Sequence, residues 1–167
     1  GQFNQSGVAA AASAAGINGV FDLVNQEEAE TFELGFKSEL LDRHLRLNGS
    51  VYTTNDKNPL YFVFIGAIGA QVLVNVDRVR STGFELEAQA NIADGFDVFA
   101  NYGYTRSRIK EYAVDPTLVG NVTPYVPKDT WAFGAQYRTP ITDNFGLFAR
   151  GDVEHHGMQF WDPENST

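Results

Sequence analysis

The chain has no cysteine, and it has few basic residues: 12 lysines and arginines against 21 aspartates and glutamates. The absence of cysteine excludes a disulfide-stabilised scaffold, a thiolate zinc site and a cysteine nucleophile. The shortage of basic residues gives a formal net charge of −9 and argues against nucleic acid as a partner. A disordered chain is excluded as well, because 43% of the residues are hydrophobic.

Aromatic residues and glycines are abundant instead. The 167 residues include 13 Phe, 7 Tyr, 2 Trp and 16 Gly. Aromatic side chains favour strands, and glycines mark bends and positions without room for a side chain. The composition therefore predicts many strands joined by tight turns, and the length alone suggests one domain.

The two ends suggest a piece of a longer protein. The sequence starts at Gly1 without an initiator Met and stops within a turn-like segment, 162–167. Residues 1–21 carry no charge, and residues 9–15 are nearly all alanine. A signal peptide would need a basic segment before the apolar one. We therefore expect a loop of small residues with one helical turn.

A second charge-free stretch runs from Asn58 to Val76. A transmembrane helix needs about 20 mostly apolar residues, which this stretch nearly supplies. Pro59, Gly66 and Gly69 interrupt it, however, and it is rich in Tyr, Phe, Val and Ile. Those residues favour two strands around a glycine bend over one helix.

Apolar and polar residues alternate along most of the chain from Glu30 onward. This period of two predicts strands with one apolar and one polar face. We expect about six strands: 29–38, 44–64, 71–92, 95–110, 125–138 and 145–161. The connections 39–43, 93–94 and 139–144 are short, whereas 65–70 and 111–124 are longer. All short turns would thus lie at one end of an antiparallel meander, as in transmembrane β-barrels.

The predicted strands are also long, since several exceed ten residues and globular strands usually have about 5–6. Trp131 and Tyr137 fall on one face, roughly 20 Å apart along their strand. Two levels of aromatic residues across an apolar band are typical of the interfacial girdles of membrane barrels. A water-soluble β-sandwich or barrel would show the same alternation, and it stays open as an alternative.

Six motifs in order resemble the barrel domain of TonB-dependent outer-membrane receptors. They are Phe32-Glu33-Leu34-Gly35-Phe36-Lys37-Ser38, Leu45-Arg46-Leu47-Asn48-Gly49-Ser50-Val51-Tyr52, Arg80-Ser81-Thr82-Gly83-Phe84-Glu85-Leu86-Glu87, Asn101-Tyr102-Gly103-Tyr104-Thr105, Tyr125-Val126-Pro127-Lys128-Asp129-Thr130 and Arg150-Gly151-Asp152-Val153. The resemblance implies an all-β fold: an antiparallel meander forming part of a bacterial outer-membrane β-barrel of about 22 strands. Residues 1–28 would be an extracellular loop segment and 29–167 a part of the C-terminal half of that barrel.

The resemblance also implies the function: active uptake of a nutrient complex, such as a siderophore-like ligand, vitamin, haem or oligosaccharide, using energy transmitted by TonB. The partners would be outer-membrane lipid, the plug domain of the same chain, the TonB complex and a small nutrient ligand. Neither enzymatic activity nor a cofactor is implied. Alternatives are another outer-membrane barrel, such as a porin or adhesin-like protein, and a soluble β-sandwich binding module.

The alternation along each predicted strand assigns the candidate residues to one side of the sheet or the other. The polar residues expected to face the lumen, as structural or plug-contacting groups, are Glu33, Lys37, Arg46, Glu85, Glu87, Asn101, Arg150 and Asp152. Lys37, Arg46 and Arg150 are the candidates to pair with carboxylates of neighbouring strands or of the plug. The aromatic residues expected to face lipid or form girdles are Phe32, Phe36, Phe84, Tyr102, Tyr104, Trp131 and Tyr137.

Other chemistry is weakly indicated. Glu85 and Glu87 have a spacing that permits a glycosidase pair, but a lumenal charge ladder is the better interpretation. Asp152, Glu154 and His156 alternate onto one face and form a weak candidate metal cluster, with polar rim residues as the favoured alternative. Candidate ligand contacts lie in the loops, such as Glu111, Tyr112, Asp115 and Tyr125.

Overall fold

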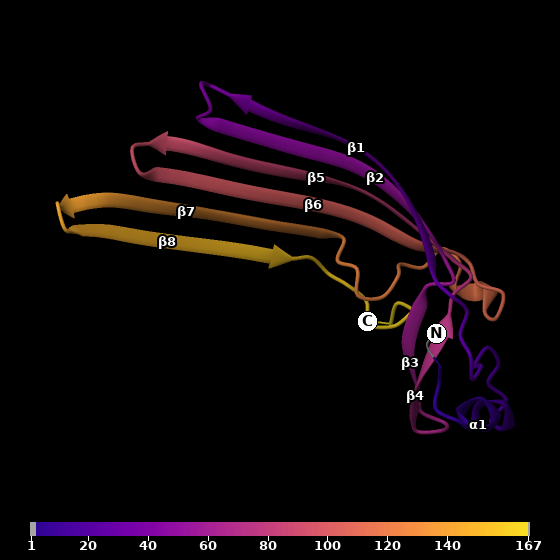
Figure 1. The fold of residues 1–167 in the computed structure, drawn as a ribbon. Helices are drawn as coiled ribbons and strands as arrows, with labels where there is room; N and C mark the ends of the chain where they lie inside the picture. The colour runs from indigo at the N-terminus through magenta and orange to yellow at the C-terminus, as the bar shows by residue number, and fades with distance from the viewer. Residues whose placement is uncertain (1–2, 167) are drawn as a thin grey trace.

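A computed structural model describes residues 3–166, most of which form one open, curved antiparallel sheet (Figure 1). The sheet has six strands in the order β1-β2-β5-β6-β7-β8. Their bounds are β1 Glu28–Leu40, β2 Leu45–Lys57, β5 Arg78–Ala93, β6 Phe96–Glu111, β7 Asp129–Thr142 and β8 Phe145–His156. The chain therefore forms the predicted meander of long strands.

Short turns lie together at one end of this sheet, at the left of Figure 1. They join β1 to β2, β5 to β6 and β7 to β8. In the second turn Gly95 has a φ of +71°, and a Cβ there would lie 1.9 Å from the carbonyl oxygen of Arg138, so only glycine fits. The longer connections lie at the opposite end, so the predicted asymmetry of the loops is confirmed.

A separate hairpin extends from the loop end of the sheet. It consists of β3 (Leu60–Ile65) and β4 (Ala70–Asn75), which pair only with each other among the strands described. The predicted strands 44–64 and 71–92 are therefore wrong in their bounds, since each is two strands. The break comes at Asn58, whose φ is +53°, and at Pro59, which has no N–H to donate to a ladder.

The last two predicted strands also differ in their bounds. Strand 125–138 begins only at Asp129 and continues to Thr142, so the predicted connection 139–144 is mostly strand, and strand 145–161 ends at His156. The predicted loop 65–70 is the tip of the β3–β4 hairpin. None of the helices in residues 3–166 is long and apolar enough to cross a membrane.

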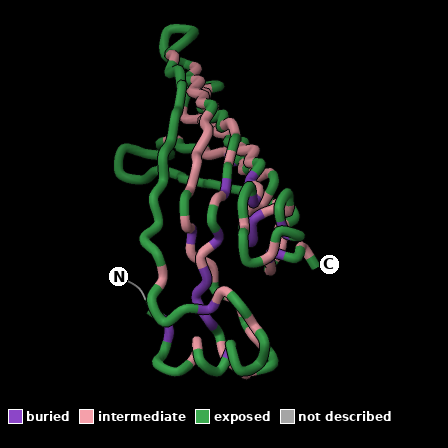
Figure 2. The backbone as a smooth tube through the Cα atoms, turned by 90° about the vertical axis from the view of Figure 1, so that its right-hand side faces the viewer, coloured by how far each residue is buried: buried purple, intermediate pink, exposed green. Residues whose placement is uncertain are grey.

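The buried apolar side chains gather at the loop end, where the purple segments lie in Figure 2. We call the three segments that meet there, residues 3–27, 58–77 and 112–128, the loop cap. Helix α1 (Val8–Ala14) occupies the alanine-rich stretch, and its Ala12 packs with Val20, Val72 and Val74. A second cluster joins Val76, Val79, Ile109 and Leu118, the last in the 3₁₀ helix η1 (Pro116–Leu118). Tyr61 packs against both clusters.

Candidate functional site

The strand register divides the predicted site residues between the two faces of the sheet. Ser50 pairs with both Gly35 and Glu85, and Glu85 pairs with Gly103, so these positions share one face. The same continuity through β7 and β8 gives this polar face all of the residues expected in the lumen: Glu33, Lys37, Arg46, Glu85, Glu87, Asn101, Arg150 and Asp152.

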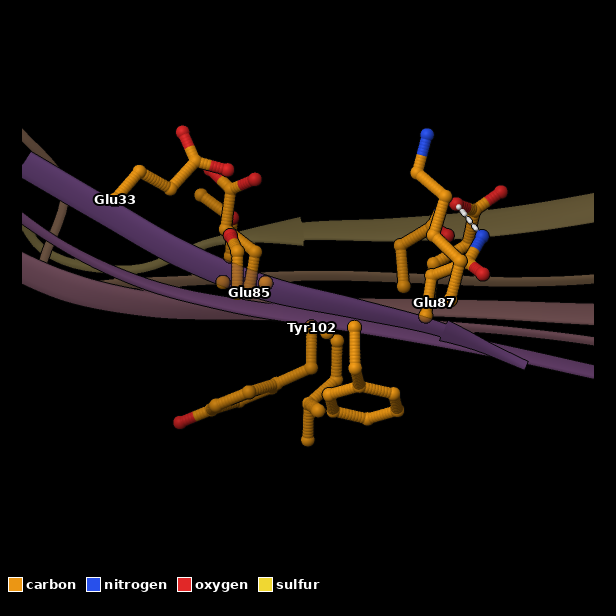
Figure 3. Close-up of a pocket in the computed structure, with 14 residues that line it drawn as sticks. Glu33, Glu85, Glu87 and Tyr102 are labelled. Atoms are coloured by element: carbon orange, nitrogen blue, oxygen red, sulfur yellow. Dashed lines mark hydrogen bonds between the residues drawn. The ribbon is translucent and has the colours of Figure 1, made fainter.

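The aromatic residues expected to meet lipid share the opposite face. We call it the aromatic face; it carries Phe32, Phe36, Phe84, Tyr102, Tyr104, Trp131 and Tyr137. Figure 3 shows the division directly, with Glu33, Glu85 and Glu87 on one side of the ribbon and Tyr102 on the other.

A shallow hollow on the polar face is bordered by carboxylates. Glu33, Glu85 and Glu87 line it together with Lys37 and Asn101. The Asn48 side chain donates a hydrogen bond of 3.0 Å to Glu87. Within residues 3–166 no hydrogen bond or ion pair joins Glu33 or Glu85 to another side chain. Glu33 and Glu85 are therefore unpaired among the described residues, and Glu87 is held by a neutral amide.

The three cations expected to pair with such carboxylates have different surroundings. Arg46 donates to Glu39 near the short turns, over 3.1 Å. Arg150 donates to Asp152 on its own strand, at 2.8 and 2.9 Å. Lys37 makes no ion pair with any other described residue. None of the three therefore neutralises Glu85 or Glu87.

An aromatic ring on the polar face belongs to a cluster that the alternation of the sequence did not predict. Phe99 covers Gly134 on the neighbouring strand, where a Cβ would lie 2.3 Å from the ring. The guanidinium of Arg150 lies 4.6 Å from the centre of the same ring, a cation–π distance. The carboxylate of Asp152 accepts hydrogen bonds from the same guanidinium. A large residue opposite a glycine would have indicated this cluster. The sequence alone could not show it, because the pairing of Phe99 with Gly134 is known only from the strand register.

The same contacts bear on the candidate metal cluster of Asp152, Glu154 and His156. Asp152 is engaged by Arg150 through both of its oxygens. In the described part of the chain no three His, Asp or Glu side chains are grouped so that they could hold a metal ion. His155, which lies between Glu154 and His156 in the sequence, is on the aromatic face and stacks on Trp131 with ring centres 5.4 Å apart.

The candidate ligand contacts in the loops mostly have internal roles. Glu111 forms an ion pair with Arg78, and Asp115 accepts a 3.0 Å hydrogen bond from the Thr117 N–H at the start of η1. Tyr112 packs against the second cluster, and this burial raises its pKa. Tyr125 is 53% exposed and meets Trp161 edge to face. Tyr125 and Glu111 are thus the exposed members of the four, and Glu111 is already paired with Arg78.

The aromatic face has rings at two levels. Near the short turns Phe96 meets Tyr137, with ring centres 6.4 Å apart. Toward the loop end Phe84 lies 5.7 Å from both Tyr102 and Tyr104. Large apolar side chains at and between these levels are exposed, among them Leu34 (75%), Val51 (54%) and Phe133 (50%).

Comparison with known proteins identifies this architecture. The family described as "TonB dependent receptor-like, beta-barrel" matches residues 2–167. The chain belongs to this family. As a TonB-dependent receptor barrel it is an outer-membrane protein, and the open sheet corresponds to part of the barrel wall.

Individual receptors show how much of the family architecture the chain covers. It is 29% identical over 131 residues to a probable TonB-dependent siderophore receptor, PiuA, of Acinetobacter baumannii, covering 73% of this chain and 17% of the relative. It is 29% identical over 139 residues to the ferrichrome outer membrane transporter/phage receptor of Escherichia coli K12, covering 83% and 18%. The chain thus spans about a fifth of the length of these receptors.

A solved structure agrees with both sequence comparisons. The ferric yersiniabactin uptake receptor FyuA of Yersinia pestis superposes with a TM-score of 0.65 at 25% identity, over 83% of this chain and 20% of the receptor. The fold predicted from the alternation and the six motifs is therefore confirmed.

Proposed function

We propose that this chain is part of the wall of a receptor that takes up a metal-chelate nutrient of the siderophore type, using energy transmitted by TonB. Two relatives support the ligand class, because their names specify a siderophore and ferrichrome. The observation that carries the proposal is the division of the sheet into a polar and an aromatic face.

The aromatic face meets lipid in this proposal. Its strands have 12 to 16 residues, whereas a bilayer-spanning strand needs about 9–11. Exposed Leu34, Val51 and Phe133 would form a large apolar patch in water, which soluble monomers avoid. Contact with lipid hydrocarbon removes the free-energy cost of exposing this patch to water. The two aromatic levels then lie at the membrane interfaces.

The polar face lines the lumen, where Glu33, Glu85 and Glu87 contact the plug domain of the same receptor. These carboxylates lack cationic partners on the sheet, so a basic group of the plug can pair with them. Gly35 and Gly103 lie beside them, and positions without side chains leave room for the plug to approach closely.

The loop cap forms part of the extracellular surface that captures the ligand. Its segments share two buried clusters, so they are ordered before a ligand arrives. A pre-ordered binding surface loses less conformational entropy on binding.

Uptake assays test the proposal. The full-length receptor containing these residues would be expressed in a Gram-negative strain without its own siderophore receptors, with and without TonB. We expect energy-dependent accumulation of radioactive iron supplied as ferrichrome or ferrioxamine. Entry that continues without TonB would instead identify a diffusion porin, and failure to transport any iron chelate would reject the siderophore class.

A further inference from the structure

The hairpin formed by β3 and β4 lies across the direction of the sheet strands. Figure 1 shows the strands of the sheet running from left to right, whereas β3 and β4 run downward at the loop end. The loop cap, to which the hairpin belongs, packs on the polar face of the sheet. Val79 and Ile109 pair in register with Glu85 and Gly103 on that face, and both are buried in the second cluster. In the proposed receptor the hairpin therefore crosses the outer mouth of the lumen.

One face of the hairpin is packed and the other is open. Val63 and Val72 pair with each other on the face that packs against Ala12 of α1. Alternation along β3 puts Phe62 and Phe64 on the opposite face, where they are 60% and 69% exposed. In Figure 1 α1 lies on the side of the hairpin away from the short turns. The open face, which carries Phe62 and Phe64, is therefore turned back toward the lumen.

The open face is apolar and carries no charge. Residues 58–76 contain no charged side chain. The segment bonded to the edge of β4 through Asn4 adds two more exposed apolar residues, Phe3 and Leu23, which pair with each other. An apolar surface of this kind is costly in water and is usually covered by a partner. A ligand that is present only during uptake would leave it exposed for the rest of the time, so a permanent partner fits it better.

We propose that the open face of this hairpin docks on the apex of the plug domain of the same receptor. The inference rests on the proposed function, in which the plug fills the lumen beneath the hairpin. The chain spans about a fifth of the length of its relatives, which leaves the plug to the remainder of the receptor. Apolar side chains at the plug apex would cover Phe62 and Phe64, and aromatic side chains bury roughly 150–250 Å² each. This contact is separate from the one proposed for the lumenal carboxylates, because it is apolar and lies at the outer mouth.

Thiol labelling measures whether the open face is covered. Phe64→Cys and Ala67→Cys would be made one at a time in the full-length receptor without other cysteines, and intact cells treated with a membrane-impermeant maleimide. Ala67 is the matched control, because it is exposed at the tip of the same hairpin. We expect Phe64→Cys to react at least about tenfold more slowly, because its labelling requires local opening of the contact. Equal rates for the two cysteines would show that the open face meets water and would overturn the proposal.

Photo-cross-linking identifies the partner and keeps an aromatic side chain in place. The full-length receptor would carry p-benzoylphenylalanine in place of Phe64 and be irradiated in the absence of ligand. We expect cross-links within the receptor from this position to peptides of the plug domain. The same group in place of Phe133, which is exposed on the aromatic face, should give no cross-link to the plug. Cross-links from position 64 only to another extracellular loop, or to a second receptor molecule, would overturn the proposal.

The uptake assay separates this inference from the proposed function. TonB-dependent uptake of iron in a receptor whose position 64 does not cross-link to the plug would reject the docking and leave the transport function intact. A receptor that gives the cross-link but transports no iron chelate would support the docking and reject the siderophore class.

Discussion

Replacing Asn4 with alanine should loosen the packing of the first segment of the loop cap on the second, because its buried side chain hydrogen-bonds to both. The Nδ2 of Asn4 donates to the carbonyls of Phe21 and Leu73 at 2.7 and 2.9 Å. Its Oδ1 accepts from the N–H of Leu73 at 2.7 Å. Asn4 is only 7% exposed, so water does not replace it readily.

The expected cost follows from those hydrogen bonds. Asn4→Ala leaves the N–H and the carbonyl of Leu73 without partners at the edge of β4. A buried polar group left unpaired costs about 1–3 kcal/mol, so the free energy of local opening should fall by roughly 3 kcal/mol. Each 1.4 kcal/mol is a factor of ten, so exchange of the Leu73 amide hydrogen should be about 100-fold faster.

Hydrogen–deuterium exchange of the full-length receptor measures this directly, using peptides that cover β4. Gln5→Ala is the matched control, because Gln5 is the exposed neighbour and its side chain makes no hydrogen bond with a described residue. Exchange of β4 that changes less than threefold in Asn4→Ala would show that the apolar clusters hold the cap without this link.

Three further predictions address the wall and the cap. Gly83→Ala should lower the thermal unfolding temperature on SDS gels at a cost of about 1–3 kcal/mol, since its Cβ would lie 2.3 Å from a backbone oxygen, whereas Gly151→Ala has open space and should be neutral. Val51→Arg on the aromatic face should cost about 2–4 kcal/mol and reduce the folded receptor in outer-membrane fractions, whereas Ser50→Arg on the polar face should be tolerated. Burial, then Asp56 and Glu27, raise the pKa of Tyr61 to about 12. Its contribution to cap stability should thus be complete below pH 10 and lost toward pH 12, and Tyr61→Phe should remove that dependence from exchange measurements.

The strands of the sheet and their two faces could be predicted from the sequence, because they depend on the order of residues within each strand. Alternation along one strand fixes which residues share a face, so Phe84 and Glu85 could be assigned to opposite faces without the register. The break between β2 and β3 was missed because strand-forming residues lie on both sides of it, Val51 to Thr54 before it and Tyr61 to Phe64 after it. Only the left-handed conformation of Asn58 and the missing N–H of Pro59 end the strand there.

The contacts of the candidate site were less predictable, since they depend on pairs distant in sequence. Facing put Arg150 on the polar side of its strand, but it could not show that Asp152 and Phe99 would engage its guanidinium. Asn4 gave no signal at all, because its role depends on the backbone of Leu73, 69 residues away.

The position of the buried residues explains how one chain can serve two surroundings. Away from the loop end, the sheet has no buried apolar cluster on either face among the described residues. In the proposed receptor its strands would depend on the hydrogen-bonded ladder and on hydrocarbon, which cannot compete for backbone hydrogen bonds. The loop cap projects beyond the sheet, and there the chain supplies its own core around Val72 and Val76. Val79 and Ile109, at the loop ends of β5 and β6, join this core to the sheet. Tyr61 joins both clusters of that core. In the proposed receptor, a ligand arriving from outside would therefore meet an ordered surface, and hydrocarbon would stabilise the wall below it.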